Sequence, residues 1–240
     1  EMAIVERYRD KLPKALLNNF EYKRAPAFAA LPPATLSVPP QGTVIPLRKT
    51  ARLASALEAD IDGHSVFLRL DTGAPTMLGE ETARQLGVRI VLQHDGALQG
   101  AMGRKSEKQL GLIDTLSFGD VVVKNLPVAI IPEEHNSLGM DVLKRVAAFR
   151  LAQHELTIYG SARQHPDCKQ PLLIGSTFWG STPLVVQQLS VDGSPRATLL
   201  DSGSDFYLTG ITHDKAAATD GQLFVKDING PGGVMKFTRQ

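Results

Sequence analysis

Leu70-Asp71-Thr72-Gly73 recurs as Leu200-Asp201-Ser202-Gly203, at an offset of 130 residues. The match extends without a gap beyond these stretches, because four further pairs share the offset: Asp62 and Asp192, Gly63 and Gly193, Leu78 and Leu208, Thr82 and Thr212. We interpret this as one supersecondary unit present twice: a strand, an Asp-Gly turn, a second strand, and Asp-[Thr/Ser]-Gly. The repeat predicts two lobes of similar fold in one chain.

The two aspartates of the repeat are candidate catalytic residues. A lone aspartate is ionised at ordinary pH and is only a weak base. Two carboxyls about 3 Å apart cannot both ionise cheaply, so they share one proton. One can then act as a base toward water and the other as an acid. We therefore expect Asp71 and Asp201 to meet in one site.

The residues that follow each aspartate have physical roles in such a site. Gly73 and Gly203 would let the backbone turn sharply and bring its N–H groups close to the carboxylates. The hydroxyls of Thr72 and Ser202 can bond the backbone of the opposite loop and hold the two loops together. Leucines beside each aspartate would exclude water from the pair.

These stretches resemble the active-site signatures of the retropepsin and pepsin clan of aspartic proteases. Leu138-Gly139-Met140-Asp141-Val142-Leu143 is similar to the apolar-glycine element that passes behind the catalytic loop and leads into a short helix in retropepsin-like domains. A glycine-rich stretch falls where the family places its substrate-covering flap, and a second candidate flap precedes the end of the chain. Their expected residues are Gly100, Ala101, Met102 and Gly103 in the first flap, and Gly232 and Gly233 in the second.

The resemblance implies a mostly β acid-protease fold with two retropepsin-like β-barrel lobes and short helices. It also implies an aspartic endopeptidase that binds an extended polypeptide in the cleft between the lobes and uses neither metal nor cofactor. Two departures stand out: Pro75 replaces a small polar residue, and the first flap lacks the tyrosine of pepsin-type flaps. The sequence stops at Gln240 before a second apolar-glycine element, so we expect the second lobe to be incomplete.

The chain divides into four segments by composition and pattern. Residues 1–42 combine a helical pattern, interrupted by Pro13, with a proline-rich stretch from residue 25 that we expect to be extended. Short β-branched runs separated by turns predict the first lobe at 43–160, with helices near 80–86 and 140–146. A polar linker at 161–170 precedes the second lobe at 171–240. Expected first-lobe strands cover 52–61, 65–70, 116–123, 126–131 and 156–159.

Composition excludes several other classes of protein. A formal net charge of +1 gives no electrostatic reason to expect nucleic acid as a partner, and no apolar run is long enough to span a membrane. Cys168 is the single cysteine, which excludes an intrachain disulfide and a thiolate zinc site. The six histidines lack metal-ligand spacing, so we interpret them as surface or core residues, and no Gly-x-Ser-x-Gly motif occurs.

Two alternatives stay open at the level of sequence. The first lobe could pair with a second copy of itself through two Asp71 residues, in place of a monomer with a pseudo-two-fold site. The chain could instead be a peptide-binding module that keeps the fold without turnover. The first residue, Glu1, suggests a leader upstream, and the resemblance to exported bacterial members favours a periplasmic or secreted location over a cytoplasmic one.

Overall fold

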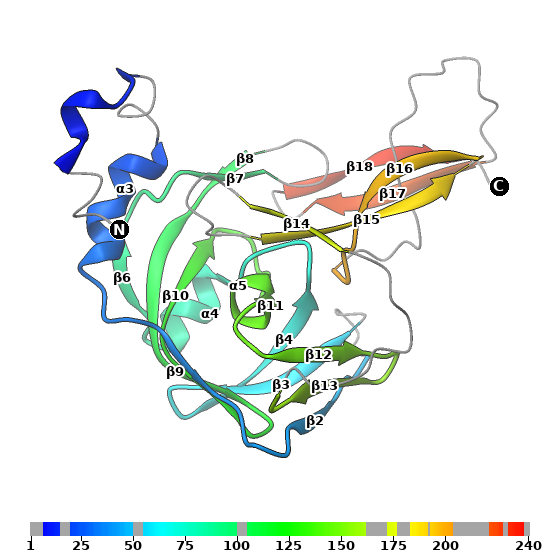
Figure 1. Cartoon of the computed structure of the whole chain (residues 1–240), viewed down its shortest axis with the longest axis horizontal. Helices are drawn as coiled ribbons and strands as arrows, with labels where there is room; N and C mark the ends of the chain where they lie inside the picture. The colour runs from blue at the N-terminus through cyan, green and yellow to red at the C-terminus, as the bar shows by residue number, and fades with distance from the viewer. Residues whose placement is uncertain are drawn as a thin grey trace.

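A computed structural model of the chain shows a mostly β architecture, as the sequence predicts (Figure 1). The structure describes residues 7–14, 20–49, 55–99, 105–161, 172–176, 183–191, 193–203, 221–227 and 230–237. Within these ranges, no helix has the length and apolarity needed to cross a membrane.

An 8-stranded sheet curls into a closed barrel and forms the first lobe. Its strands follow the order β1-β10-β5-β11-β4-β3-β9-β6, and an additional pairing of β10 with β9 closes the ring. The bounds are β1 Thr35–Ser37, β3 Ala56–Ile61, β4 His64–Asp71, β5 Met77–Gly79, β6 Arg89–Leu92, β9 Gln109–Phe118, β10 Val121–Ile131 and β11 Ser137–Gly139. The long hairpin of β9 and β10 curves along one side of the barrel (Figure 1).

The β3–β4 hairpin illustrates how the sequence specifies this barrel. Asp62 and Gly63 connect the strands with positive φ angles of 51° and 88°, the conformation that a two-residue hairpin turn requires. Along β4, Leu68 and Leu70 are fully buried in the barrel core, whereas Phe67 on the other face is partly exposed. Asp71 is the last residue of this strand and is itself buried.

In the described part of the chain, short helices and two smaller sheets accompany the barrel. The helices are η1 Arg9–Lys11, α3 Phe20–Ala29, α4 Glu80–Gln85 and α5 Met140–Leu143. Strands β12 Ala148–Leu151, β13 Glu155–Tyr159 and β2 Thr43–Pro46 form a 3-stranded sheet. Strands β7 Ala97–Gln99 and β8 Lys105–Glu107 form a separate hairpin.

Several expected boundaries differ from the observed ones. Residues 25–29 belong to α3 instead of an extended connector, because the carbonyl of Pro26 still accepts a helical hydrogen bond from Ala30 N at 3.1 Å. The strands expected at 116–123 and 126–131 are interrupted only by the Gly119 turn and together form the end of β9 and all of β10. Helix α5 ends at Leu143, short of the expected 146.

The second part of the chain contains two small sheets in its described residues. Strands β14 Leu173–Ser176, β15 Pro183–Val191 and β16 Ser194–Leu199 form one, and β17 Gly221–Asp227 and β18 Gly230–Phe237 form the other. Val185 of β15 joins the buried core of the first lobe, and α5 packs against β15. This contact fixes β15, and through it β16, at the end of the barrel where β4 and β11 end (Figure 1).

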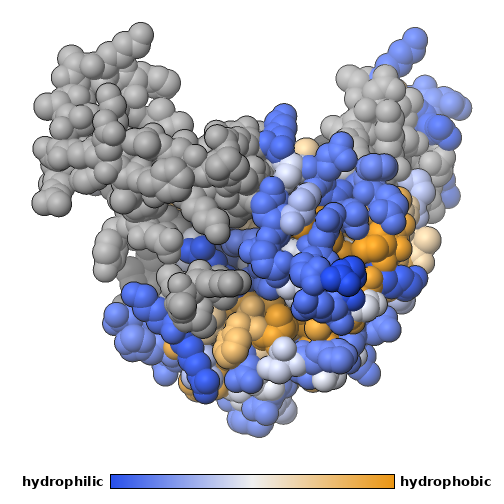
Figure 2. All heavy atoms as spheres, turned by 180° about the vertical axis from the view of Figure 1, so that it is seen from behind, coloured by the Kyte–Doolittle hydropathy of each residue, from blue (hydrophilic) through white to orange (hydrophobic). Residues whose placement is uncertain are grey.

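The described surface is predominantly hydrophilic on the face seen from behind, with limited apolar areas between the polar side chains (Figure 2). Most large apolar side chains are buried in the barrel, where one continuous cluster includes Leu57, Leu70, Ile113 and Phe118. A single large core is therefore what holds β4 and β11 in place.

Candidate active site

Two buried strands position the first aspartate. Strand β11 runs parallel to β4, so that Leu138 lies opposite Leu70 and Gly139 lies opposite Asp71. Both leucines are fully buried. The chain leaves β4 at Asp71 and turns across the end of β11, which matches the arrangement that the apolar-glycine resemblance implies.

Gly139 is the point of closest approach between the turn and β11. A Cβ atom at this position would lie 2.3 Å from both the carbonyl oxygen of Ala74 and the carbonyl carbon of Pro75. No rotamer change relieves a clash between a Cβ and backbone atoms, so only glycine fits without moving the turn. Pro75, a departure from the family pattern, is thus part of this contact.

The second aspartate follows β16, which ends at Leu199. Leu200 N donates to the carbonyl of Val185 at 2.9 Å, which extends the pairing with β15 to the residue before Asp201. Leu200 also packs against the core of the first lobe. Asp201 therefore enters the site from a strand that the first lobe's core supports.

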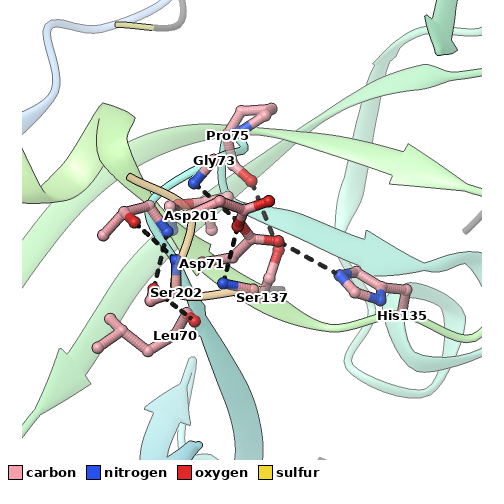
Figure 3. Close-up of polar contacts among 12 residues, drawn as sticks. Leu70, Asp71, Gly73, Pro75, His135, Ser137, Asp201 and Ser202 are labelled. Carbon is pink, nitrogen blue, oxygen red and sulfur yellow. Dashed lines mark hydrogen bonds and ion pairs between the residues drawn. The ribbon is translucent and has the colours of Figure 1, made fainter. Parts of the chain in front are cut away.

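The two loops bind each other through a reciprocal set of hydrogen bonds (Figure 3). The Thr72 hydroxyl donates to the carbonyl of Leu200 at 2.7 Å and accepts from Ser202 N at 2.9 Å. The Ser202 hydroxyl donates to the carbonyl of Leu70 at 3.0 Å and accepts from Thr72 N at 3.0 Å. Each hydroxyl thus bonds the backbone of the opposite loop, and the set has pseudo-two-fold symmetry.

This interlock brings the two carboxyl groups together. Gly73 N donates to Asp71 Oδ1 at 2.9 Å, and Gly203 N donates to Asp201 Oδ1 at 2.8 Å. A Cβ on Gly73 would lie 2.6 Å from Cγ of Asp201, and a Cβ on Gly203 would lie 2.4 Å from Cγ of Asp71. Each glycine therefore leaves room for the carboxyl of the other loop.

The two carboxyls lie in different surroundings. Asp71 is 8% exposed, whereas Asp201 is exposed. Burial and the neighbouring Asp201 carboxylate raise the pKa of Asp71 to about 6, against the opposing effects of the Gly73 N–H and of Arg69. Asp71 is thus the member of the pair that holds a proton in mildly acidic solution.

Residues 57–142 match the family model described as aspartyl protease. This segment is therefore similar to aspartyl proteases over about a third of the chain. It contains the whole of β4, the Asp71 turn and β11, the elements that make the first half of the site.

The chain is also similar in part to a solved structure. A retropepsin-like aspartic protease from Rickettsia conorii aligns over 53% of this chain and 94% of its own, with 19% sequence identity and a TM-score of 0.40. A search of curated proteins finds no significant match to the chain.

The candidate flap residues are only partly described. Strands β7 and β8 form a hairpin where the first flap is expected, but Gly100, Ala101, Met102 and Gly103 lie outside the described residues. Lys108 and the buried carboxylate of Asp95 form an ion pair at the base of this hairpin. Gly232 and Gly233 lie in β18, paired with β17, and their flap role stays a prediction.

Asp141 is a buried carboxylate that the sequence analysis placed only within the apolar-glycine element. It accepts hydrogen bonds from the backbone N and the hydroxyl of Thr76 at 2.8 and 2.7 Å. The Thr76 hydroxyl in turn accepts from Gly139 N at 3.1 Å. Burial raises the pKa of Asp141, and the Thr76 bonds oppose this. The network ties the end of the Asp71 turn to β11 and α5.

His135 is the site residue that sequence reasoning missed. Its spacing groups it with surface and core histidines, yet its Nε2 lies 4.0 Å from Oδ2 of Asp71 (Figure 3). Its side chain is 13% exposed. The only signal in the sequence was its place four residues before Gly139. Among the described residues, no cluster of three or more potential ligands is placed to hold a metal ion.

Proposed function

We propose that the protein is an aspartic endopeptidase in which Asp71 and Asp201 of one chain activate water against a peptide carbonyl. The observation that carries this proposal is the reciprocal bonding of Thr72 and Ser202 to the opposite loops, which holds both carboxyls in one place. A single Asp-Thr-Gly turn would be consistent with many structural roles. Two such turns that interlock and present their carboxyls to each other favour acid–base chemistry.

The proposed reaction uses the pair with one shared proton. The ionised carboxyl removes a proton from water, and the water oxygen forms a bond to the carbonyl carbon. The protonated carboxyl gives its proton to the carbonyl oxygen, which yields a neutral tetrahedral diol. Collapse of the diol breaks the C–N bond: the carboxyl that is now protonated gives its proton to the departing amine nitrogen, and the ionised carboxyl takes the proton of a diol hydroxyl, which leaves a carboxylic acid and restores the shared proton. The burial of Asp71 supports this scheme, since it keeps the pair protonated at mildly acidic pH.

The substrate in this proposal is an extended polypeptide. The β7–β8 hairpin would cover it and add backbone hydrogen bonds, as a strand added to a sheet does. The role of residues 100–103, which follow β7 in the sequence, is part of the proposal. The glycines there would allow the hairpin to lie close to a substrate backbone.

Two alternatives make different predictions. A homodimer that used two copies of Asp71 would need the space that Asp201 fills in the single chain, so the contact of Gly203 with Asp71 favours the one-chain site. A binding module without turnover would have no need for a protonated buried carboxyl beside an exposed one. Both observations support the one-chain peptidase.

The test is cleavage of a fluorogenic peptide library by the wild-type chain and by Asp71→Asn across pH 3 to 8. We expect cleavage by the wild type that declines as pH rises through about 6, where Asp71 loses its proton. A statine-containing transition-state mimic should inhibit this cleavage. Asp71→Asn should lose it, since asparagine can neither hold nor release the shared proton. Cleavage by Asp71→Asn at the wild-type rate would refute the proposal.

A further inference from the structure

We propose that His135 is a positioning residue of the site, whose imidazolium favours the ionised form of Asp71. The proposal rests on the proposed function for its consequence on activity, but the electrostatic coupling can be measured without turnover. The geometric basis is the 4.0 Å separation between His135 Nε2 and Asp71 Oδ2, at which a protonated imidazole and a carboxylate form an ion pair.

The structure holds the backbone of His135 in place from two sides. Asn136, the residue after His135, accepts a hydrogen bond at its carbonyl oxygen from Arg69 N at 2.9 Å. Arg69 lies on β4, two residues before Asp71. The Asn136 side chain accepts from Gly79 N at 3.0 Å and donates to the Thr82 hydroxyl at 3.0 Å. The histidine therefore sits on a loop bonded both to the strand that bears Asp71 and to the start of α4, and its position is fixed independently of substrate.

The charge that faces the His135 ring is the Asp71 carboxylate, 4.0 Å away. Glu133 and Glu134 precede His135 in the same loop; Glu133 accepts from the Ser106 hydroxyl, and Glu134 accepts from the Thr82 hydroxyl. Two further groups act on Asp71: Arg69 favours its ionised form and Asp201 opposes it. An imidazolium 4.0 Å from Asp71 would act on this carboxyl in the same direction as Arg69 does.

Removal of the imidazolium should therefore raise the pH at which Asp71 ionises. Two unit charges 4.0 Å apart interact weakly in bulk water and several-fold more strongly near a protein surface. Loss of this interaction corresponds to an upward shift of the Asp71 titration by about one pH unit or more. His135 would thus set the upper end of the active pH range at a lower pH than the carboxyl pair alone would give. The direction of the shift distinguishes an electrostatic role from a packing role.

The experiment is a carbon-13 NMR titration of the Asp71 carboxyl in the full chain, together with the pH profile of kcat/KM. The variants are His135→Gln, which removes the charge, and His135→Lys, which keeps a permanent one. His64→Gln is the matched control, because His64 is exposed and begins β4, the strand that ends at Asp71. Thermal unfolding monitored by circular dichroism verifies that each variant is folded.

We expect His135→Gln to shift the Asp71 titration upward by about one unit, and His135→Lys and His64→Gln to leave it within a few tenths of the wild-type value. The falling limb of kcat/KM should move in the same direction. An unchanged titration in His135→Gln, or equal shifts in the glutamine and lysine variants, would overturn the proposal. If the wild type cleaves no peptide, the proposed function fails, but the NMR titration still decides the coupling of His135 to Asp71.

Discussion

Thr72→Val tests the interlock between the two aspartate loops. Valine has nearly the shape of threonine but lacks the hydroxyl, which donates to the carbonyl of Leu200 and accepts from Ser202 N. Both backbone groups would face a methyl group instead of a partner. Thr72 is buried and Ser202 is half-buried, so water has limited access to replace the lost bonds.

The expected cost follows from the two backbone groups left without a partner. A buried donor or acceptor that loses its partner costs about 1–3 kcal/mol, so Thr72→Val should lower the free energy of unfolding by about 2–4 kcal/mol. The displaced Asp201 loop should lower kcat/KM on the order of 100-fold, because a misplacement of about 1 Å has effects of that size. Urea unfolding and cleavage of a fluorogenic peptide measure the two quantities.

Ser202→Ala provides the symmetric partner of this variant. It removes the hydroxyl that bonds Leu70 O and Thr72 N, and the double variant should lose less stability than the sum of the single ones, since the loops separate as a unit. Thr157→Val on β13 is the matched control, expected to change stability by less than about 0.5 kcal/mol. An unfolding free energy and a kcat/KM at wild-type levels in Thr72→Val would refute the interlock as the basis of the site.

Three further variants test other contacts. Asp71→Asn should raise the free energy of unfolding at pH 7.5 by about 2–3 kcal/mol and leave it unchanged below pH 4. The reason is that the pKa of Asp71 is raised from 3.8 to about 6 in the folded state, so this carboxyl binds its proton more tightly there. The stability of the wild type therefore falls as pH rises between those two values. Gly139→Ala should destabilise the fold by more than about 3 kcal/mol in urea unfolding, because its Cβ would meet backbone atoms at 2.3 Å. Asp141→Ala should cost about 2–4 kcal/mol in the same assay, because two Thr76 donors lose their acceptor.

Gly139→Ala and Asp141→Ala each have a matched control elsewhere in the chain. Gly193→Ala should cost only about 1 kcal/mol, because its φ of 74° is strained for alanine but open space surrounds it. Asp114→Ala removes an exposed carboxylate and should be nearly neutral. Equal losses in a test variant and its control would contradict the assigned contact, and a loss of stability at pH 7.5 in Asp71→Asn would contradict the burial of charge at that position.

The parts of the fold that sequence predicted are those set by local patterns. The Asp62-Gly63 turn, the leucines before Asp71 and the glycine of the apolar-glycine element each determine their own backbone, so the first lobe and its Asp71 turn followed from them. The hydroxyl of Thr72 was expected to reach the opposite loop, and it does. These features need no knowledge of distant residues.

The features that sequence missed depend on which strands become neighbours. His135 approaches Asp71 because β11 pairs in parallel with β4, which places the loop before β11 beside Arg69, within reach of the Asp71 side chain. Asp141 becomes a partner of Thr76 through the same crossing. Helix α3 continues through Pro26 because a proline lacks only the backbone N–H donor. Its carbonyl still accepts the hydrogen bond from Ala30 N in the last turn.

The peptidase activity of Asp201→Asn tests the central claim of a one-chain pair most directly. The asparagine side chain in this variant would keep an oxygen that accepts from Gly203 N, so the loop geometry should persist while the acid–base function is lost. The one-chain site predicts a folded variant without measurable cleavage at any protein concentration. Cleavage at the wild-type rate, especially if it rises with protein concentration as an Asp71 homodimer requires, would contradict it.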